Sequence, residues 1–389
     1  MDIISYVSPV DKDSLDIHSN DPSLLYNTIH FFTDTEPEWH KVNIAIMGMP
    51  ESKKAYNNPN THLAPDEIRK QFYQLYCWNK EVNIWDIGNI IPGASYEDTT
   101  EILSELIAGL IDEKVIPIIL GGSNDLAFAN YKAYEKLQHI MNFVAIDARF
   151  DLGEEEDELK SNSYLNKIIL QQPNYLLNYA NIGYQTYMNS PTTIALMDKL
   201  FFETYRVGMI RQDITEVEPI VRNAEMLSLD VSAIRKSDAP GNPNSSANGF
   251  YGEEICQIAM YAGLSDKLSS IGIYEYDPLL DYNGQTAQLL GHFIWYFIEG
   301  FLNRQDDLTF KDKSNYTKYT VTVSGTVEDE MIFYCSKKTG RWWVVVPVIN
   351  IEKKTQQSYY LPCSYNDYKT ACTDRIPDRW WRAFNKFNR

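Results

Sequence analysis

The stretch VIPIILGGSNDLAFANYKAYEKLQHIMNFVAIDARFD, residues 115–151, decides the fold of this 389-residue chain. It begins with an apolar run over 115–122, continues with a helical pattern over 123–137, and ends with a second apolar run over 143–151. A strand, a helix and a strand in this order predict two parallel strands joined by a right-handed crossover. Both strands end in polar residues, which is typical of a site at the carboxyl edge of a parallel sheet.

The same alternation continues from residue 42 to about residue 304. Further strands are predicted over 42–50, 82–88, 180–185, 204–210, 225–232 and 268–278. Further helices are predicted over 64–77, 96–114, 190–203, 252–265 and 286–302. The pattern therefore predicts a three-layer α/β domain, in which helices cover both faces of a parallel sheet.

The composition indicates a folded, acidic protein. Apolar residues make up 44% of the chain and aromatic residues 13%, which is enough to build a core. With 35 basic and 53 acidic side chains, the net charge of −18 repels phosphate backbones, so nucleic acid is not an expected partner. The sequence contains no apolar run of membrane-spanning length, no secretory signal, and five cysteines without a CxxC pair. We expect a cytoplasmic protein with reduced thiols.

Residue pattern and charge divide the chain into three parts. Residues 1–41 are a polar lead-in without clear periodicity, and residues 42–304 form the α/β domain. Residues 305–389 contain 14 basic and 10 acidic side chains, a net +4, whereas residues 1–304 contain 21 and 43, a net −22. Three β-rich runs and the amphipathic segment PDRWWRAFNKFN, residues 377–388, predict a β-rich C-terminal extension that ends in a helix.

Two interpretations fit the aromatic residues of this extension. They either pack a small core against the α/β domain, or anchor a protein partner, since Trp and Arg dominate protein interfaces. The candidates for interaction are Trp342, Trp343, Trp380, Trp381 and Arg382.

Four predicted strands end in motifs rich in acids. They are Gly121-Gly122-Ser123-Asn124-Asp125, Asp147-Ala148-Arg149-Phe150-Asp151, Ser228-Leu229-Asp230-Val231-Ser232 followed by Ala239-Pro240-Gly241, and Glu275-Tyr276-Asp277-Pro278. Carboxylates that converge at one edge of a sheet repel one another, so they need a metal or a basic partner.

In this order, the motifs resemble those of the arginase, agmatinase and formimidoylglutamase superfamily, the ureohydrolases, over about residues 42–302. Ala64-Pro65, Ile68-Arg69, Gly249 and Glu254 are supporting matches. The resemblance implies an arginase-like α/β fold. It also implies two manganese ions, held by two histidines and four aspartates, and a hydroxide that attacks a guanidinium or formimino carbon.

The chain departs from this pattern at three ligand positions. Asn124 and Arg149 stand where the family has its two histidines, and Ser232 stands where it has its fourth aspartate. Asp147, Asp151 and Asp230 remain. We expect no metal or other cofactor; if a divalent ion such as manganese does bind, these three aspartates are its ligands.

Arg149 suggests how the cluster is neutralised without metal. Its guanidinium cannot act as a metal ligand, but it can pair bidentately with one or two of the three carboxylates. Our hypothesis is that Arg149 replaces the metal ions.

Glu275 has two interpretations. In the family this residue contacts the cationic group of the substrate, but here it could instead pair with Arg149 or Arg235. Arg235 and Lys236, which replace a family aspartate and proline, place added positive charge by the mouth of the pocket.

We therefore predict a ureohydrolase-like pseudoenzyme that serves as a binding or scaffold protein, with a protein partner or a homo-oligomeric state. The alternative is an active metal-dependent C–N hydrolase of formimidoylglutamase or guanidino-hydrolase type, with a single or unusual metal site.

Overall fold

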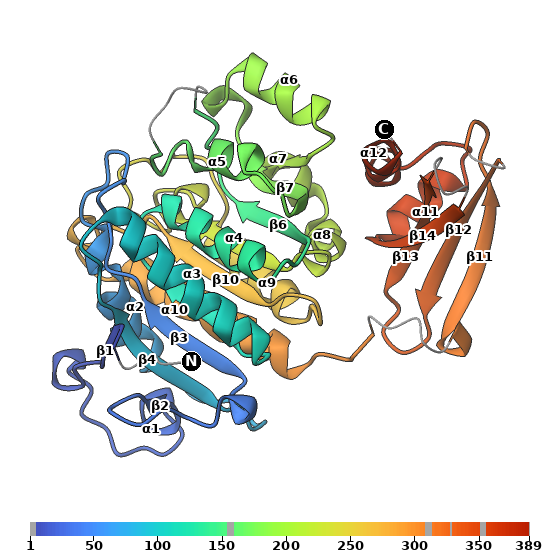
Figure 1. The fold of residues 1–389 in the computed structure, drawn as a ribbon. Helices are drawn as coiled ribbons and strands as arrows, with labels where there is room; N and C mark the ends of the chain where they lie inside the picture. Colours follow the sequence, from blue (N-terminus) through green and yellow to red (C-terminus); the bar gives the residue numbers. More distant parts are fainter. Residues whose placement is uncertain (1–4, 154–158, 308–312, 327–328, 351–354, 389) are drawn as a thin grey trace.

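A ten-stranded sheet organises the first three quarters of the chain, as the ribbon in Figure 1 shows. The computed structural model describes residues 5–153, 159–307, 313–326, 329–350 and 355–388. The strands are β1 (Val7–Ser8), β2 (His30–Phe31), β3 (Ile44–Gly48), β4 (Ile84–Ile90), β5 (Ile116–Leu120), β6 (Met141–Ile146), β7 (Leu176–Tyr184), β8 (Glu203–Arg206), β9 (Met226–Asp230) and β10 (Ser270–Tyr274).

The strand order is β1-β4-β3-β5-β10-β9-β6-β7-β8, with β2 also beside β4. Among the described pairings of this sheet only β1 with β4 is antiparallel, so the predicted parallel sheet is confirmed. The lead-in, for which no element was predicted, supplies β1 and β2.

Helices cover both faces of the sheet. They are α1 (Leu25–Thr28), α2 (Ala64–Phe72), α3 (Tyr96–Asp112), α4 (Ala127–Lys136), α5 (Tyr164–Leu170), α6 (Pro191–Lys199), α7 (Val207–Gln212), α8 (Glu218–Arg222), α9 (Gly252–Gly263) and α10 (Gln285–Leu302). Successive side chains of a strand point to opposite faces. Ile44 and Ile46 accordingly join the core beneath α2, α7, α8, α9 and α10, whereas Ala45 and Met47 join the core beneath α3, α4, α5 and α6.

One predicted strand was partly wrong. Residues 204–210 divide into the end of β8 and the helix α7. Val207 and Ile210 are both buried, and their spacing of three places them on one face of a helix. This helical period in an apolar run explains the error.

A buried ion pair locks α2 to the sheet. Arg69 Nε lies 2.7 Å from Asp86 Oδ2, both side chains are fully buried, and the Tyr73 hydroxyl also donates to this carboxylate. Asp86 belongs to β4, so the pair fixes the helix that follows β3 against the neighbouring strand. A buried pair of this kind sets a unique arrangement more than it adds stability.

The C-terminal extension forms a separate antiparallel sheet. Its strands, in the order β11-β12-β13-β14, are β11 (Tyr316–Thr322), β12 (Glu330–Ser336), β13 (Trp342–Asn350) and β14 (Thr355–Cys363). The helices α11 (Tyr365–Ala371) and α12 (Asp378–Phe387) follow. The β-rich extension with a terminal helix was predicted, whereas β14 and α11 were not.

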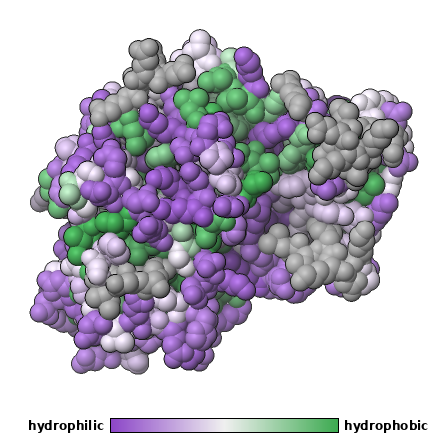
Figure 2. Space-filling view, viewed as in Figure 1, coloured by the Kyte–Doolittle hydropathy of each residue, from purple (hydrophilic) through white to green (hydrophobic). Residues whose placement is uncertain are grey.

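The extension packs against its own α/β domain. Trp343 is buried and lies beneath the guanidinium of Arg222, whose carbon is 4.3 Å from the ring centroid. The Tyr359 hydroxyl donates to Asn223 Oδ1 at 3.0 Å. In the space-filling view of Figure 2, side chains fill much of the gap between the two ribbons, and the visible face is mostly hydrophilic.

All five candidate interaction residues make contacts within the chain. Trp343 and Trp380 are buried, and Trp342 stacks on Tyr368 with ring centroids 4.8 Å apart. Arg382 donates to the Phe202 carbonyl at 2.8 Å and pairs with Asp198 at 3.0 Å. Trp381 is 44% exposed, but its ring also contacts that of Phe201, with centroids 5.4 Å apart. A protein partner therefore stays a prediction.

Among the described residues, no helix is both long and apolar enough to cross a membrane.

The Arg379–Glu203 pair should be essential for docking of the extension. Arg379 Nε of α12 lies 2.6 Å from Glu203 Oε2 of β8, and both side chains are buried. Arg379→Met leaves the Glu203 carboxylate without its cation, which should cost about 3–5 kcal/mol of stability. Thermal unfolding measures the loss. Arg375→Met, at an exposed arginine of the same extension, is the control. Equal midpoints for the two variants would contradict the prediction.

Candidate functional site

Four adjacent strands of the sheet bring the predicted site residues together. In the order β5, β10, β9 and β6, their carboxyl ends lead to Asn124, Glu275, Asp230 and the pair Asp147 and Asp151. All five side chains are buried. The carboxyl edge of a parallel sheet is the usual position of such a site.

Two glycines shape the turn that carries Asn124. Gly121 and Gly122 end β5 with φ of +81° and +76°, a left-handed conformation that side chains rarely adopt. A Cβ on Gly122 would also lie 2.2 Å from the Leu126 side chain. The glycines thus turn the chain so that Asn124 reaches the ends of β6 and β9.

Asp147, Asp151 and Asp230 form one acidic cluster. One carboxylate oxygen of each lies within 4.8 Å of the others. Local turns orient two of them, since Asp147 Oδ1 accepts from the Arg149 backbone N–H at 2.8 Å, and Asp230 Oδ1 from that of Ser232 at 2.6 Å. Among the described residues this is the one group of three or more acids, histidines or cysteines spaced to hold an ion.

Burial and mutual repulsion hold protons on this cluster. Burial raises the pKa of Asp147 well above its usual value, and the negative charges of Asp151 and Asp230 raise it further. Burial likewise raises the pKa of Asp151 to about 7, with Asp230 adding to the effect. Burial also raises the pKa of Asp230. The three charges are thus poorly compensated by protein groups.

Asn124 contributes an oxygen that has no partner. Its Nδ2 donates to Asp151 Oδ2 at 3.0 Å and to Asp230 Oδ2 at 3.3 Å, whereas its Oδ1 is buried without a hydrogen bond. A rotation of the side-chain amide by about 180° exchanges Oδ1 and Nδ2 and places the oxygen toward the cluster. Three carboxylates and an amide oxygen fit one hard divalent cation such as Mg²⁺, Ca²⁺ or Mn²⁺.

The structure contradicts the predicted pairing of Arg149. Among the described ion pairs and hydrogen bonds, none joins its guanidinium to Asp147, Asp151 or Asp230. The backbone of Arg149 is held in the turn, where its carbonyl accepts from Asn181 Nδ2 at 2.9 Å. Its half-buried side chain instead lines a neighbouring pocket, so the predicted bidentate pairing is not formed.

A second cation does not fit the residues present. Arg149 offers no lone pair, and Ser232, although buried, offers only a neutral hydroxyl. These two residues stand where the family motifs have a histidine and an aspartate as metal ligands. The donor set therefore suits one ion and not two.

Glu275 pairs with neither Arg149 nor Arg235. Its carboxylate accepts from the Asn124 backbone N–H at 2.9 Å and from Asn58 Nδ2 at 2.8 Å. Burial, with the negative charge of Asp230, raises its pKa to about 8. The ion-pair alternative for Glu275 is thus wrong, and its carboxylate fixes the turn that carries Asn124.

Sequence reasoning missed Asn58 and Asn242. Asn58 Nδ2 also donates to the Glu275 carbonyl at 3.0 Å, and Asn242 Nδ2 donates to it at 2.7 Å. They support Glu275 at a φ of +67°. The only signal was the asparagine-rich turn over 56–60, which carries no recognisable spacing.

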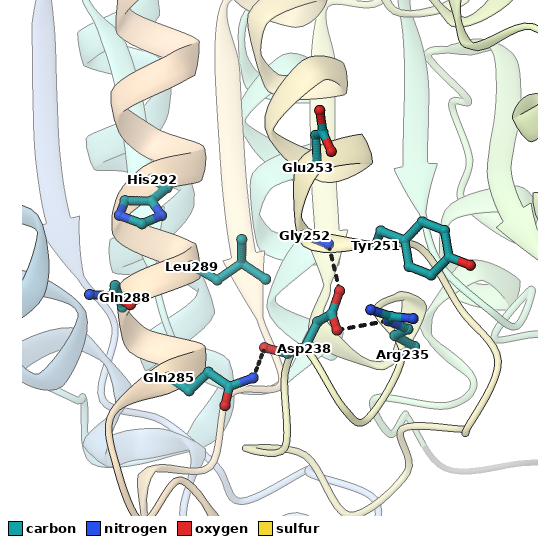
Figure 3. A pocket seen from close by; sticks show the side chains of 9 residues that line it. All are labelled: Arg235, Asp238, Tyr251, Gly252, Glu253, Gln285, Gln288, Leu289 and His292. Atoms are coloured by element: carbon teal, nitrogen blue, oxygen red, sulfur yellow. Dashed lines mark hydrogen bonds and ion pairs between the residues drawn. The ribbon is translucent and has the colours of Figure 1, made fainter.

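No described contact joins Arg235 to the acidic cluster. Figure 3 shows it paired with Asp238, at 2.7 Å from Nε to Oδ1, and its guanidinium carbon lies 4.0 Å from the Tyr251 ring centroid. It lines a pocket of about 480 Å³ that includes His292 but none of the three aspartates. The charge that Arg235 was expected to add near the site is thus neutralised by Asp238. No described contact brings the Lys236 side chain to the cluster.

Comparison with known proteins agrees with this geometry. The Arginase family profile matches residues 42–299, and the chain therefore belongs to the arginase family. Formimidoylglutamase of Bacillus subtilis (strain 168) is 23% identical over 279 residues, which cover 66% of this chain and 86% of that protein.

Two solved structures share the fold. The crystal structure of the Bacillus subtilis formimidoylglutamase has a TM-score of 0.67 at 20% identity, and the match covers 74% of this chain and 95% of that one. The structure of Trypanosoma cruzi formiminoglutamase with Mn²⁺₂ has a TM-score of 0.66 at 16% identity and covers 72% and 99%. The interpretation as a pseudoenzyme gains no support from these relatives.

The acidic cluster should make stability fall as pH rises. The pKa of Asp151 is about 7 in the folded chain and ordinarily 3.8, so the contribution of its proton is complete below about pH 4 and lost as pH approaches 7. In protein stripped of metal by a chelator, the thermal midpoint of wild type minus that of Asp151→Asn should therefore decrease from about pH 4 to about pH 8. A constant difference would contradict the raised pKa.

Proposed function

We propose that this chain is a metal-dependent hydrolase of C–N bonds, of formimidoylglutamase type, with a single divalent cation. The observation that carries the proposal is the orphaned, buried Oδ1 of Asn124 beside three buried and poorly compensated carboxylates. Fourteen buried side-chain nitrogen or oxygen atoms of the described residues lack a partner, and Asn124 Oδ1 is the one whose residue contacts the acidic cluster. A buried polar atom without a partner calls for an explanation, such as an ion. The proposal replaces our expectation that the chain has no cofactor.

Each residue of the cluster has a role in this proposal. Asp147, Asp151 and Asp230 hold the cation, and Asn124 completes the oxygen donors. A cation held there would supply Lewis-acid polarisation and would lower the pKa of a neighbouring water. Glu275 accepts from the Asn124 backbone N–H and so holds the turn, and the side chains of the cluster are buried.

The reaction that fits this set is hydrolysis of an amidine. Water adds to the amidine carbon, the bond from that carbon to the substrate nitrogen breaks, and the nitrogen takes up a proton. With an N-formimidoyl amino acid, the products are the free amino acid and formamide. Glu275, beside the cluster, has a pKa that burial raises to about 8, so it is one of the carboxyl groups that can hold a proton near neutral pH.

A binding protein without catalysis is the second candidate. Arg149 and Ser232 favour it, because they remove the ligands that a second cation would need. Both candidates keep the acidic cluster, but only the first turns over substrate.

Cation binding and turnover test the proposal. Wild-type protein should bind about one equivalent of Mn²⁺ or Mg²⁺ per chain and release formamide from N-formimidoyl-L-glutamate. Asp230→Asn should lose both properties, because it removes one of three anionic ligands. Isothermal titration calorimetry measures binding. Glu253→Gln, an exposed acid in the pocket of Figure 3, should match wild type. Cation binding without turnover would favour the binding protein, and no binding would refute the hydrolase.

Restoring the family ligands should increase the number of ions bound. The triple variant Asn124→His, Arg149→His and Ser232→Asp supplies two imidazoles and a carboxylate, which suit Mn²⁺ better than an amide, a guanidinium and a hydroxyl. Elemental analysis should then show about two Mn²⁺ per chain where wild type shows about one. An unchanged content would mean that the supporting residues around the cluster no longer fit two ions.

A further inference from the structure

A polar pocket of about 510 Å³ adjoins the acidic cluster. Arg149 and Asp151, which follow β6, line it together with Asn162. Asn189, Ser190, Thr192 and Thr193, at the beginning of α6, supply amide and hydroxyl groups. The volume is in the usual range for a metabolite site. Asp151 belongs to both the pocket and the cluster, so a ligand in this pocket lies next to the proposed cation.

Arg149 is the cationic side chain of this lining. A guanidinium offers five N–H donors and no acceptor. Among the described residues, no carboxylate lies within 4.0 Å of its nitrogens, and no hydrogen bond from the guanidinium is formed. It nevertheless lies near the cluster, since it lines the same pocket as Asp151. The donors of Arg149 are therefore available to a ligand.

The surroundings of Arg149 favour an anionic ligand. Its guanidinium is half-buried, where the attraction to an anion is stronger than in open water. The nine-residue helix α6 begins at the pocket, and the positive end of its dipole adds to this preference. Two parallel N–H donors of an arginine match the two oxygens of a carboxylate.

We propose that Arg149 forms an anion subsite that binds a carboxylate of the substrate while the amidine carbon lies at the cation cluster. This inference rests on the proposed hydrolase function and narrows its substrate class. Acidic amidines, such as N-formimidoyl amino acids, fit the pocket, and cationic guanidino amines such as agmatine are repelled by Arg149. A position that lost a metal ligand thus determines specificity.

One substitution, Arg149→Met, should change the affinities for glutamate and for Mn²⁺ in opposite directions. Arg149→Met keeps the length of the side chain but removes its charge and donors. It should weaken binding of L-glutamate, the product of a formimidoyl substrate, by roughly 10- to 100-fold, the range for a lost charge-assisted hydrogen bond. The same variant should bind Mn²⁺ more tightly than wild type, because a positive charge near the three carboxylates is gone.

The experiment is a set of calorimetric titrations on the full chain. Mn²⁺ is titrated first, and L-glutamate is then titrated with and without saturating Mn²⁺. Arg149→Lys should recover part of the glutamate affinity, since it restores the charge but not the bidentate geometry. Arg206→Met, at an exposed arginine outside the pocket, should match wild type in both titrations. Agmatine should bind wild type more weakly than Arg149→Met.

The outcomes separate this inference from the proposed function. Unchanged glutamate affinity in Arg149→Met overturns the subsite, and parallel loss of glutamate and Mn²⁺ affinity also overturns it, since that indicates a structural role. Failure of wild type to bind Mn²⁺ refutes the hydrolase. In that case the glutamate titration without metal tests the subsite by itself. Glutamate binding that depends on Arg149 supports an anion site, and a lack of such binding rejects it.

Discussion

Mutual repulsion among three buried carboxylates is the constraint around which this molecule is arranged. Asp147, Asp151 and Asp230 come from two adjacent strands, and the parallel sheet leaves them no freedom to separate. No described ion pair or hydrogen bond joins a basic side chain to these carboxylates, and the charge of Arg149 only partly offsets the effect of burial on Asp151 and Asp230. The protein surrounds the cluster with amides instead: Asn124 contacts the carboxylates, while Asn58 and Asn242 hold the neighbouring Glu275. A neutral shell of this kind keeps the cluster intact and leaves its charge for an ion to balance.

The fold supports this arrangement at some distance. The Arg69–Asp86 pair fixes α2, whose first turn packs against the glycines that precede Asn124: a Cβ on Gly121 would lie 2.8 Å from Pro65. Ala64-Pro65 and Ile68-Arg69, supporting matches in the sequence, thus have a structural reason to stand together. They brace the turn that presents Asn124, and they touch neither the cluster nor the pocket beside it.

A feature of this fold could be predicted from the sequence where neighbouring residues determine it, and could not be predicted where residues far apart in the chain determine it. The central strands are apolar runs, and residues at their ends must meet at one edge of the sheet, so the cluster itself was predictable. The direction of the Arg149 side chain was not, because it depends on a turn in which Asp147 and Asn181 hold the backbone. β14 was missed because its first half, TQQS, is polar, and its pairing with β13 is a tertiary contact. The asparagines that hold Glu275 are far from it in sequence and belong to no motif.

The docking of the C-terminal extension also has a consequence for assembly. β8 is the last strand of the central sheet, and α12 lies against it through Arg379 and Glu203. An uncovered edge strand offers unpaired N–H and C=O groups to any other strand, which favours aggregation. Here two arginines of the tail hold the beginning of that strand: Arg379 pairs with Glu203, its first residue, and Arg382 donates to the Phe202 carbonyl just before it. A strand of another chain that paired along the whole of β8 would therefore meet the tail at this end.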